Sequence, residues 1–386
     1  MSARARLLKC TPAVLGFIVA SAVLSSAQTL TVLHYFQGAD GQNPGAVILD
    51  AAGNIYGETP AGGNISICGG GCGNIFRIAA SSKEFSAVNF QGTNGNGING
   101  PLARNAKGDL FGTAYMGGVS NLGTIFEADT QARRILFFSF GSGGEPVTGV
   151  VLDAEGNLYG TMTLGGASGA GGIFELTPEG KYSLLYSFSP PMDGYFPTSL
   201  TMGPSDRLYG TNGNGGVFGG GTIFSLDKAG KFTVLYSFTG GTDGGYPLGP
   251  LLFGANGEAY GVAGSSYPGE GLIFQFDKGG TETVLYTFEG DGGFPNGGLV
   301  ADPEGNLYGT TFGTGDFDGG LVFELAAGRD FEALYKFTNG SSGYAPGAGL
   351  ARDSSGTLYG TTIGGGEGDC YDGLFNGCGV VFKLVP

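Results

Sequence analysis

Residues 306–311 read Asn-Leu-Tyr-Gly-Thr-Thr, residues 321–325 read Leu-Val-Phe-Glu-Leu, and residues 331–337 read Phe-Glu-Ala-Leu-Tyr-Lys-Phe. Each run is short, rich in aromatic and branched residues, and bounded by turn-forming residues, which is typical of β-strands. No 3.6-residue period is present, so helices are not indicated. Together with the segment that precedes them, the three runs predict one four-stranded unit with strands at Gly298–Asp302, Asn306–Thr311, Leu321–Leu325 and Phe331–Phe337.

The same motifs recur seven times, and the aromatic residue of the first motif returns every 48 to 55 residues. In the first, Leu-Tyr-Gly-Thr and variants, this residue is Tyr56, Phe111, Tyr159, Tyr209, Tyr260, Tyr308 and Tyr359. The second, Gly-Thr-Ile-Phe and variants, ends at Phe76, Phe126, Phe174, Phe224, Phe274, Phe323 and Phe382. The third, Val-Leu-Tyr-Ser-Phe and variants, ends at Phe36, Phe90, Phe140, Phe188, Phe238, Phe288 and Phe337. Seven such repeats predict an all-β, seven-bladed β-propeller with four strands per blade.

The two ends of the chain are out of phase with the repeat. Thr29–Phe36 matches the fourth strand of a unit, whereas Gly379–Leu384 matches the third strand and nothing follows it but Val385 and Pro386. The last blade therefore lacks its outer strand, and the N-terminal segment is the spare one. Pairing the two would close the ring and remove two exposed sheet edges.

Composition excludes several classes of protein. The 386 residues include 81 Gly and 17 Pro, but 41% are hydrophobic and only 13% are charged, which is the opposite of a disordered chain. The single histidine, His34, rules out a multi-histidine metal site, and in register with Tyr186 and Tyr236 it is expected to be structural. A net charge of −15 argues against nucleic acid or an anionic membrane as partner. No catalytic residue set and no required cofactor can be identified.

Residues 1–27 have the pattern of a secretory signal peptide, with a basic start, an apolar run and small residues before Gln28. We therefore expect one mature domain, residues 28–386, secreted or periplasmic and without membrane insertion after cleavage. Four cysteines remain in an oxidising compartment, Cys68 and Cys72 in one Gly-rich loop and Cys370 and Cys378 in another. Disulfides within each loop are favoured, while pairing between loops and a four-thiolate zinc site are the alternatives.

The motifs, with the Asp-Gly-x-x-Pro that follows the third of them, resemble the Gloeobacter/Verrucomicrobia tandem repeat, also called the GloVer or "choice-of-anchor" repeat. The resemblance covers essentially all of residues 29–386. It implies an exported bacterial protein of propeller type and implies no catalytic residue. Some relatives carry a C-terminal anchoring segment; this chain shows none before Pro386, which favours free secretion or the periplasm.

In a propeller, the loop between the second and third strands shares one face with the link between blades. The links carry Asp-Gly-x-x-Pro four times, and three units depart from this pattern. We take as candidate ligand-binding residues the carboxylates and the aromatics before the prolines: Asp40, Asp193, Asp243, Asp291, Phe196, Tyr246 and Phe294. The structural alternatives are Asx turns for the aspartates and packing between blades for the aromatics. The turns of the opposite face are expected to be purely structural.

Two functions fit these patterns. The preferred one is a non-catalytic scaffold that binds an extracellular polysaccharide, or another surface protein, through the loop face. The alternative is a polysaccharide hydrolase or lyase that uses carboxylates or Tyr near the central channel, because an acid pair needs no histidine. Calcium is a weak further option, since Asp316-Phe317-Asp318-Gly319 only partly resembles a calcium loop.

Overall fold

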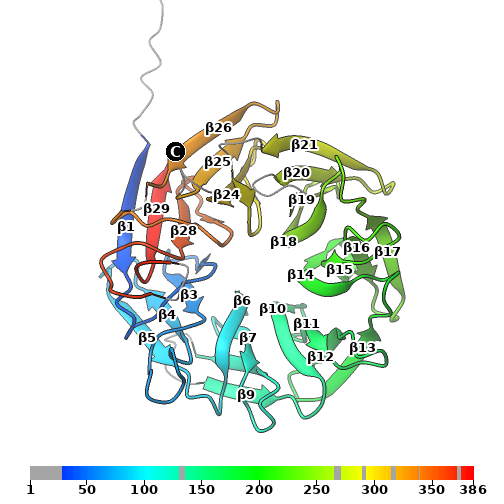
Figure 1. Cartoon of the computed structure of the whole chain (residues 1–386), viewed down its shortest axis with the longest axis horizontal. Helices are drawn as coiled ribbons and strands as arrows, with labels where there is room; N and C mark the ends of the chain where they lie inside the picture. The colour runs from blue at the N-terminus through cyan, green and yellow to red at the C-terminus, as the bar shows by residue number, and fades with distance from the viewer. Residues whose placement is uncertain are drawn as a thin grey trace, which may run out of the picture.

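The computed structural model describes residues 28–129, 135–264, 271–288, 293–313, 319–338, 340–371 and 375–386. Seven antiparallel sheets are arranged around a central axis in a seven-bladed β-propeller, which confirms the predicted fold (Figure 1). In blades 1 to 6 the strands run outward from the axis in chain order, and in blade 7 the N-terminal strand is outermost. The predicted signal peptide, residues 1–27, lies outside the described residues.

Blades 1 to 4 contain the following elements. Blade 1 has β2 (Ile48–Leu49), β3 (Ile55–Thr59), β4 (Asn74–Ile78) and β5 (Phe85–Asn89); blade 2 has β6 (Asn96–Arg104), β7 (Leu110–Met116), β8 (Thr124–Ala128) and β9 (Ile135–Ser139). Blade 3 has β10 (Gly144–Leu152), β11 (Leu158–Leu164), β12 (Gly172–Leu176) and β13 (Tyr182–Ser187); blade 4 has β14 (Tyr195–Gly203), a 3-10 turn η1 (Pro204–Asp206), β15 (Arg207–Asn214), β16 (Thr222–Leu226) and β17 (Phe232–Ser237).

Blades 5 to 7 complete the ring. Blade 5 has β18 (Gly245–Phe253), β19 (Ala259–Gly264), β20 (Gly271–Phe276) and β21 (Glu282–Phe288); blade 6 has β22 (Phe294–Pro295), β23 (Val300–Ala301), β24 (Leu307–Phe312), β25 (Leu321–Leu325) and β26 (Phe331–Lys336). Blade 7 has β27 (Ala351–Arg352), β28 (Leu358–Thr362), β29 (Val380–Val385) and β1 (Thr29–Tyr35).

The three sequence motifs meet at one place in every blade. The glycine of the first motif lies directly across from the phenylalanine of the second, as Gly57 does from Phe76. A Cβ atom at these seven glycines would lie only 2.4–2.6 Å from Cζ of that ring, so only glycine fits. The same ring meets the phenylalanine of the third motif from the preceding blade, edge to face, with centroids 4.9–5.7 Å apart. All fourteen rings are at most 1% exposed.

The N-terminal strand closes the ring as predicted. Strand β1 pairs antiparallel with β29, from Thr29↔Val385 to Tyr35↔Val380, and becomes the outer strand of blade 7. Phe36, which follows it, is fully buried and contacts Phe76 of blade 1 with ring centroids 5.3 Å apart. The first and last segments of the chain thus share one sheet, as Figure 1 shows.

Near the axis, neighbouring blades touch through glycine backbones. A Cβ atom at Gly100 would lie 2.4 Å from the Gly149 amide nitrogen, and one at Gly297 would lie 2.2 Å from the Gly349 amide nitrogen. The inner edge of blade 6 differs from the prediction: it is formed by β22 (Phe294–Pro295) and β23 (Val300–Ala301), which both pair with β24, rather than by one strand over Gly298–Asp302.

We predict that deleting residues 28–36 destroys the cooperative fold. The deletion removes the β1–β29 ladder, exposes the β29 edge and empties the site of Phe36, whose truncation alone costs about 3–5 kcal/mol. Thermal unfolding followed by circular dichroism should lose its single sharp transition, compared with a control chain that begins at residue 28. An unchanged transition in the deletion variant would show that closure by β1 is not needed.

Candidate functional site

Loops and links form one face of the propeller, as the strand order requires. Described links between blades hydrogen-bond the neighbouring second-to-third-strand loops. The Gln42 amide donates to the Ala61 carbonyl (3.0 Å), and the Tyr246 amide donates to the Gly220 carbonyl (2.7 Å). We call this surface, which carries the described candidate binding residues, the loop face.

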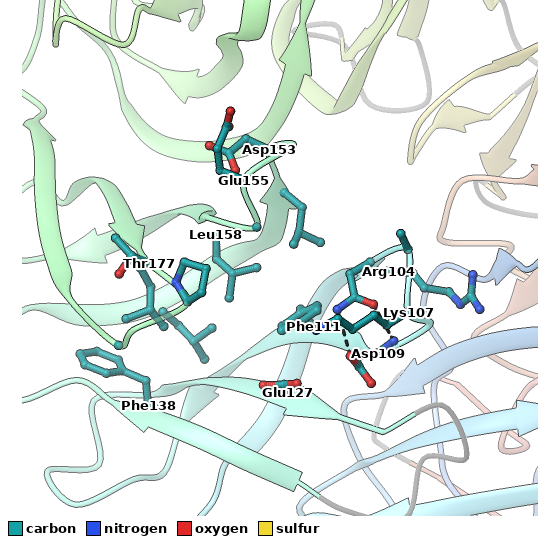
Figure 2. Close-up of a pocket in the computed structure, with 18 of the residues that line it drawn as sticks. Arg104, Lys107, Asp109, Phe111, Glu127, Phe138, Asp153, Glu155, Leu158 and Thr177 are labelled. Atoms are coloured by element: carbon teal, nitrogen blue, oxygen red, sulfur yellow. Dashed lines mark hydrogen bonds between the residues drawn. The ribbon is translucent and has the colours of Figure 1, made fainter.

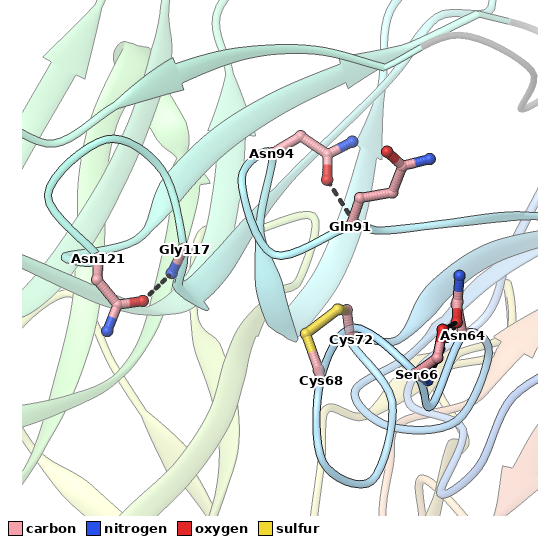
Figure 3. Close-up of a disulfide and its surroundings, with 8 residues drawn as sticks. All are labelled: Asn64, Ser66, Cys68, Cys72, Gln91, Asn94, Gly117 and Asn121. Atoms are coloured by element: carbon pink, nitrogen blue, oxygen red, sulfur yellow. Dashed lines mark hydrogen bonds between the residues drawn. A yellow bond between two sulfur atoms is a disulfide. The ribbon is translucent and has the colours of Figure 1, made fainter.

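Both disulfides stabilise long loops of the loop face. Cys68 pairs with Cys72, and Cys370 pairs with Cys378, which confirms pairing within each loop. Cys72 and Cys378 are fully buried. Figure 3 shows the Cys68–Cys72 loop beside the link that contains Gln91 and Asn94. A loop rich in glycine buries little apolar area of its own, so the disulfide bond contributes to holding it in one conformation.

The link aspartates bond inward, to the outer strand that precedes them. Asp193 accepts hydrogen bonds from the Tyr186 hydroxyl (2.6 Å) and the Ser189 amide (2.9 Å). Asp243 accepts bonds from the Tyr236 hydroxyl (3.0 Å) and the Thr239 amide (2.8 Å). Each half-buried carboxylate therefore shapes its own turn.

Asp40 follows the same scheme with a different partner. Its carboxylate lies 2.9 Å from His34 Nε2 and accepts a 2.7 Å bond from the Gln37 amide. Burial alone would raise the pKa of Asp40, but these hydrogen bonds outweigh it and hold the pKa below its ordinary value. The His34 ring stacks on Phe85, as the Tyr186 ring stacks on Phe232, so His34 has the structural place expected from its register.

One unit that departs from Asp-Gly shows what this position requires. In the second link the Asn94 side-chain oxygen accepts the Gln91 amide at 2.8 Å, the bond that Asp40 makes with Gln37 (Figure 3). An uncharged side chain therefore serves the turn equally well. The fourth candidate carboxylate, Asp291, lies outside the described residues.

Two of the three candidate aromatics come together. Phe196 is 49% exposed and Tyr246 is 39% exposed, and their ring centroids are 6.4 Å apart. Both adopt left-handed backbone, with φ of 61° and 50°, as do Asn43, Glu145 and Ala345 before the prolines of other links, so this conformation belongs to the repeat. Phe294 differs: it is half-buried, and its ring covers the backbone of Gly264.

Sequence reasoning missed Glu282, at the start of β21. In two other blades the outer strand begins with a phenylalanine that stacks on a tyrosine of the preceding blade, Phe232 on Tyr186 and Phe331 on Tyr286. In blade 5 this first residue is Glu282, which lies near Tyr236. Burial, and then the negative charge of Asp243, raise the pKa of Glu282 to about 7. The signal was available, because Glu282 breaks the aromatic pattern of the outer strands.

Glu282→Gln should stabilise the protein in a pH-dependent way. The folded-state pKa of about 7 lies above the ordinary value of 4.5, so ionisation of Glu282 destabilises the fold as pH rises from about 4.5 to 7. We expect the amide variant to match the parent protein at pH 4.5 and to gain about 2 °C in Tm at pH 8. Equal effects at both pH values would contradict this.

Glu58 is a second residue that sequence reasoning missed. It replaces the threonine of the first motif, and the equivalent Thr361 donates a 2.7 Å hydrogen bond to the Gly45 carbonyl across the blade boundary. Glu58 is 3% exposed, and its Oε2 atom has no hydrogen-bond partner. Burial raises its pKa well above the ordinary value. The signal was the Gly-Glu-Thr of blade 1 where most other blades have Gly-Thr.

We predict that Glu58→Thr stabilises the fold by about 1–3 kcal/mol at pH 8, because an unpaired buried carboxyl is lost. Since the folded-state pKa is raised, the parent protein loses stability as pH rises above 4.5, and the gain in the variant should shrink toward pH 4.5. Urea unfolding at the two pH values measures the difference. Glu58→Gln, which keeps the shape but cannot ionise, is the matched control; a less stable Glu58→Thr variant at pH 8 would be the opposite result.

The described part of the chain contains no group of three or more His, Cys, Asp or Glu side chains that could hold a metal ion. The candidate calcium loop around Asp316 and Asp318 lies mostly outside that part. The described residues also contain no helix that is long and apolar enough to span a membrane.

The sequence matches the model of the Gloeobacter/Verrucomicrobia repeat at residues 16–142 and 128–302. The chain belongs to this repeat family. This confirms the resemblance drawn from the Leu-Tyr-Gly-Thr and Gly-Thr-Ile-Phe motifs. No curated protein matches the sequence.

Solved structures show the same fold at low identity. The extracellular domain of a hybrid two-component system from B. thetaiotaomicron has a TM-score of 0.59 at 13% identity, with 93% of this chain and 41% of that chain covered. A fungal alcohol oxidase of the AA5 family, in complex with copper, has a TM-score of 0.56 at 13% identity, with 93% and 76% covered. This repeat chain thus spans less than half of the first of these proteins, and the likeness concerns the fold alone.

The two disulfides also bear on location. Disulfides persist in oxidising environments outside the cytoplasm, and the described residues hold two of them on one face. This agrees with an extracellular protein. The choice between a secreted and a periplasmic protein belongs to the proposal below.

Proposed function

We propose that this exported propeller, secreted or periplasmic, is a binding protein that takes an extracellular polysaccharide on its loop face, with Phe196 and Tyr246 as the platform. The observation that carries the proposal is the exposed ring pair itself. Two large rings 6.4 Å apart, each about two-fifths to one-half exposed, offer flat apolar faces to a ligand. Sugar rings present flat apolar faces of their own, with hydroxyls at the rim.

The backbone supports this use of the rings. Phe196 and Tyr246 have the left-handed φ that also precedes the prolines of other links, and buried prolines at 197 and 247 fix the chain that follows. One edge of the Tyr246 ring rests on Gly213, where a Cβ atom would lie 2.9 Å from the ring. The platform is therefore held rigidly, which reduces the ordering cost of binding.

The surroundings extend the apolar area and add polar groups. Tyr195 is 43% exposed and Phe218 is 63% exposed on neighbouring parts of blade 4. A cavity of about 310 Å³ opens beside Tyr195 and Phe196 and reaches Thr163 of blade 3. The loop face beyond it consists of glycine-rich backbone, whose amides and carbonyls can hydrogen-bond hydroxyl groups. A neutral polymer of sugars fits this mixture better than a charged ligand.

The test is a glycan-array screen of residues 28–386, with and without EDTA, followed by calorimetry on the best hit. Phe196→Ser and Tyr246→Ser should each weaken binding at least tenfold, about 1.4 kcal/mol, because each removes one stacking surface. Phe196→Tyr and Tyr246→Phe keep the rings and should bind like the parent protein. EDTA reports separately whether Ca²⁺ contributes.

Glu304→Ala, in an exposed turn of the opposite face, is the control and should bind normally. Absence of binding to any glycan would overturn the polysaccharide proposal. Binding that survives both serine substitutions would place the ligand elsewhere on the propeller. Release of shortened sugars from a bound polymer would favour the hydrolase or lyase alternative instead.

A further inference from the structure

A separate groove lies on the face opposite the loop face, between blades 2 and 3. It has a volume of about 980 Å³ and is bordered by the turns near Lys107, Glu155 and Thr177 (Figure 2). The corresponding boundary between blades 4 and 5 holds a cavity of only about 390 Å³. The larger volume is within the range of small-molecule sites.

The repeat itself explains why the groove is open. At two other boundaries an arginine of the next blade covers the tyrosine of the first motif: Arg104 lies over the Tyr56 ring at 5.8 Å, and Arg352 lies over the Tyr308 ring at 5.9 Å. In blade 2 this residue is Phe111, and the next blade supplies Leu152 instead of an arginine. The boundary loses both a hydroxyl and a long cationic side chain.

The missing hydroxyl leaves a carboxylate without its internal donor. In blade 3 the Tyr159 hydroxyl donates to Asp153 and to Glu175, each at 3.0 Å. Glu127 is the equivalent of Glu175 in blade 2, since it pairs across the strands with Phe111 as Glu175 pairs with Tyr159. Phe111 has no hydroxyl, and among the described residues no side-chain hydrogen bond to half-buried Glu127 is formed.

The turn that would supply the second acceptor has also changed. Asp153 receives the hydroxyl in blade 3, but blade 2 has Asn105 there, with an aspartate at 109 in place of the usual asparagine. These two side chains bond each other, Asn105 Nδ2 to Asp109 Oδ2 at 3.0 Å. Several departures from the repeat thus coincide at one groove and leave Glu127 facing it, as Figure 2 shows.

The lining determines which ligand fits. Phe111, Phe138 and Leu158 provide apolar walls for a ring. Four carboxylates border the groove against two cationic side chains: Asp109, Glu127, Asp153 and Glu155 against Arg104 and Lys107. A ligand with a ring and a positively charged donor would restore to Glu127 the hydrogen bond that a tyrosine provides in blade 3.

We propose that the groove between blades 2 and 3 is a binding site for a small arylalkylamine, whose ring lies against Phe111 and whose ammonium group bonds Glu127. The site is independent of the loop face and of any polysaccharide bound there. It depends on Phe111, because blade 2 is the one repeat that has phenylalanine where the six others have tyrosine.

The experiment is calorimetric titration of residues 28–386 with tyramine, and with 4-hydroxyphenylacetate as the anionic counterpart of equal ring size. Tyramine should saturate one site with a Kd of about 1 mM or tighter, and the acid should not saturate. Phe111→Tyr should abolish tyramine binding, because the new hydroxyl bonds Glu127 and takes the place of the ammonium group. This variant carries the residue of the other blades and is expected to keep its Tm.

Glu127→Gln should weaken tyramine binding at least tenfold, since an amide cannot pair with the ammonium charge. Glu175→Gln, at the equivalent place in blade 3, is the matched control and should bind like the parent protein. The proposal is overturned if tyramine does not saturate by about 10 mM, or if the acid binds equally well. It is also overturned if Phe111→Tyr and Glu127→Gln both bind like the parent protein.

Discussion

The propeller depends on one repeated contact, in which a phenylalanine ring lies on a glycine of its own blade and meets, edge to face, a phenylalanine of the blade before. Seven such contacts join the seven blades, and the glycine is required because a Cβ atom would enter the ring. Each blade buries its apolar face only against its neighbours, so no blade is stable alone and the last must join the first. The contact between Phe36 and Phe76 makes that final join.

Because the contact recurs, the sequence could predict much of the fold. The spacing of the motifs located the strands, the mismatched ends predicted closure by Thr29–Phe36, and the placement of the cysteines favoured pairing within each loop. Prediction failed at the inner edge of blade 6, where β22 and β23 share the pairing with β24. It also did not reach the contacts between blades at the axis, as between Gly297 and Gly349, because these residues are about 50 apart. Periodicity within one repeat carries no information about such contacts.

The candidate sites were less predictable for a related reason. Asp193 and Asp243 attracted attention by their charge, but their carboxylates are bound to Tyr186 and Tyr236 seven residues earlier, a partnership that only the folded outer strand creates. The left-handed backbone at Phe196 and Tyr246 precedes the link prolines, as it does at Asn43, Glu145 and Ala345, so it follows the repeat. The sequence shows that Phe111, Glu58 and Glu282 depart from the repeat. It does not show the consequences, which are an open groove beside Phe111 and raised pKa values at Glu58 and Glu282, because these depend on how the chain packs in the folded structure.

In the two proposals, stability and recognition are separate: the contacts repeated in every blade hold the ring, and the units that differ from the repeat supply the binding surfaces. The most direct test of this account is a double-mutant cycle between Phe36 and Phe76, each changed to Leu, with stability measured by urea unfolding. The account predicts a favourable coupling of about 0.5–1.5 kcal/mol. Additive effects, with no coupling, would contradict the claim that this ring pair closes the propeller.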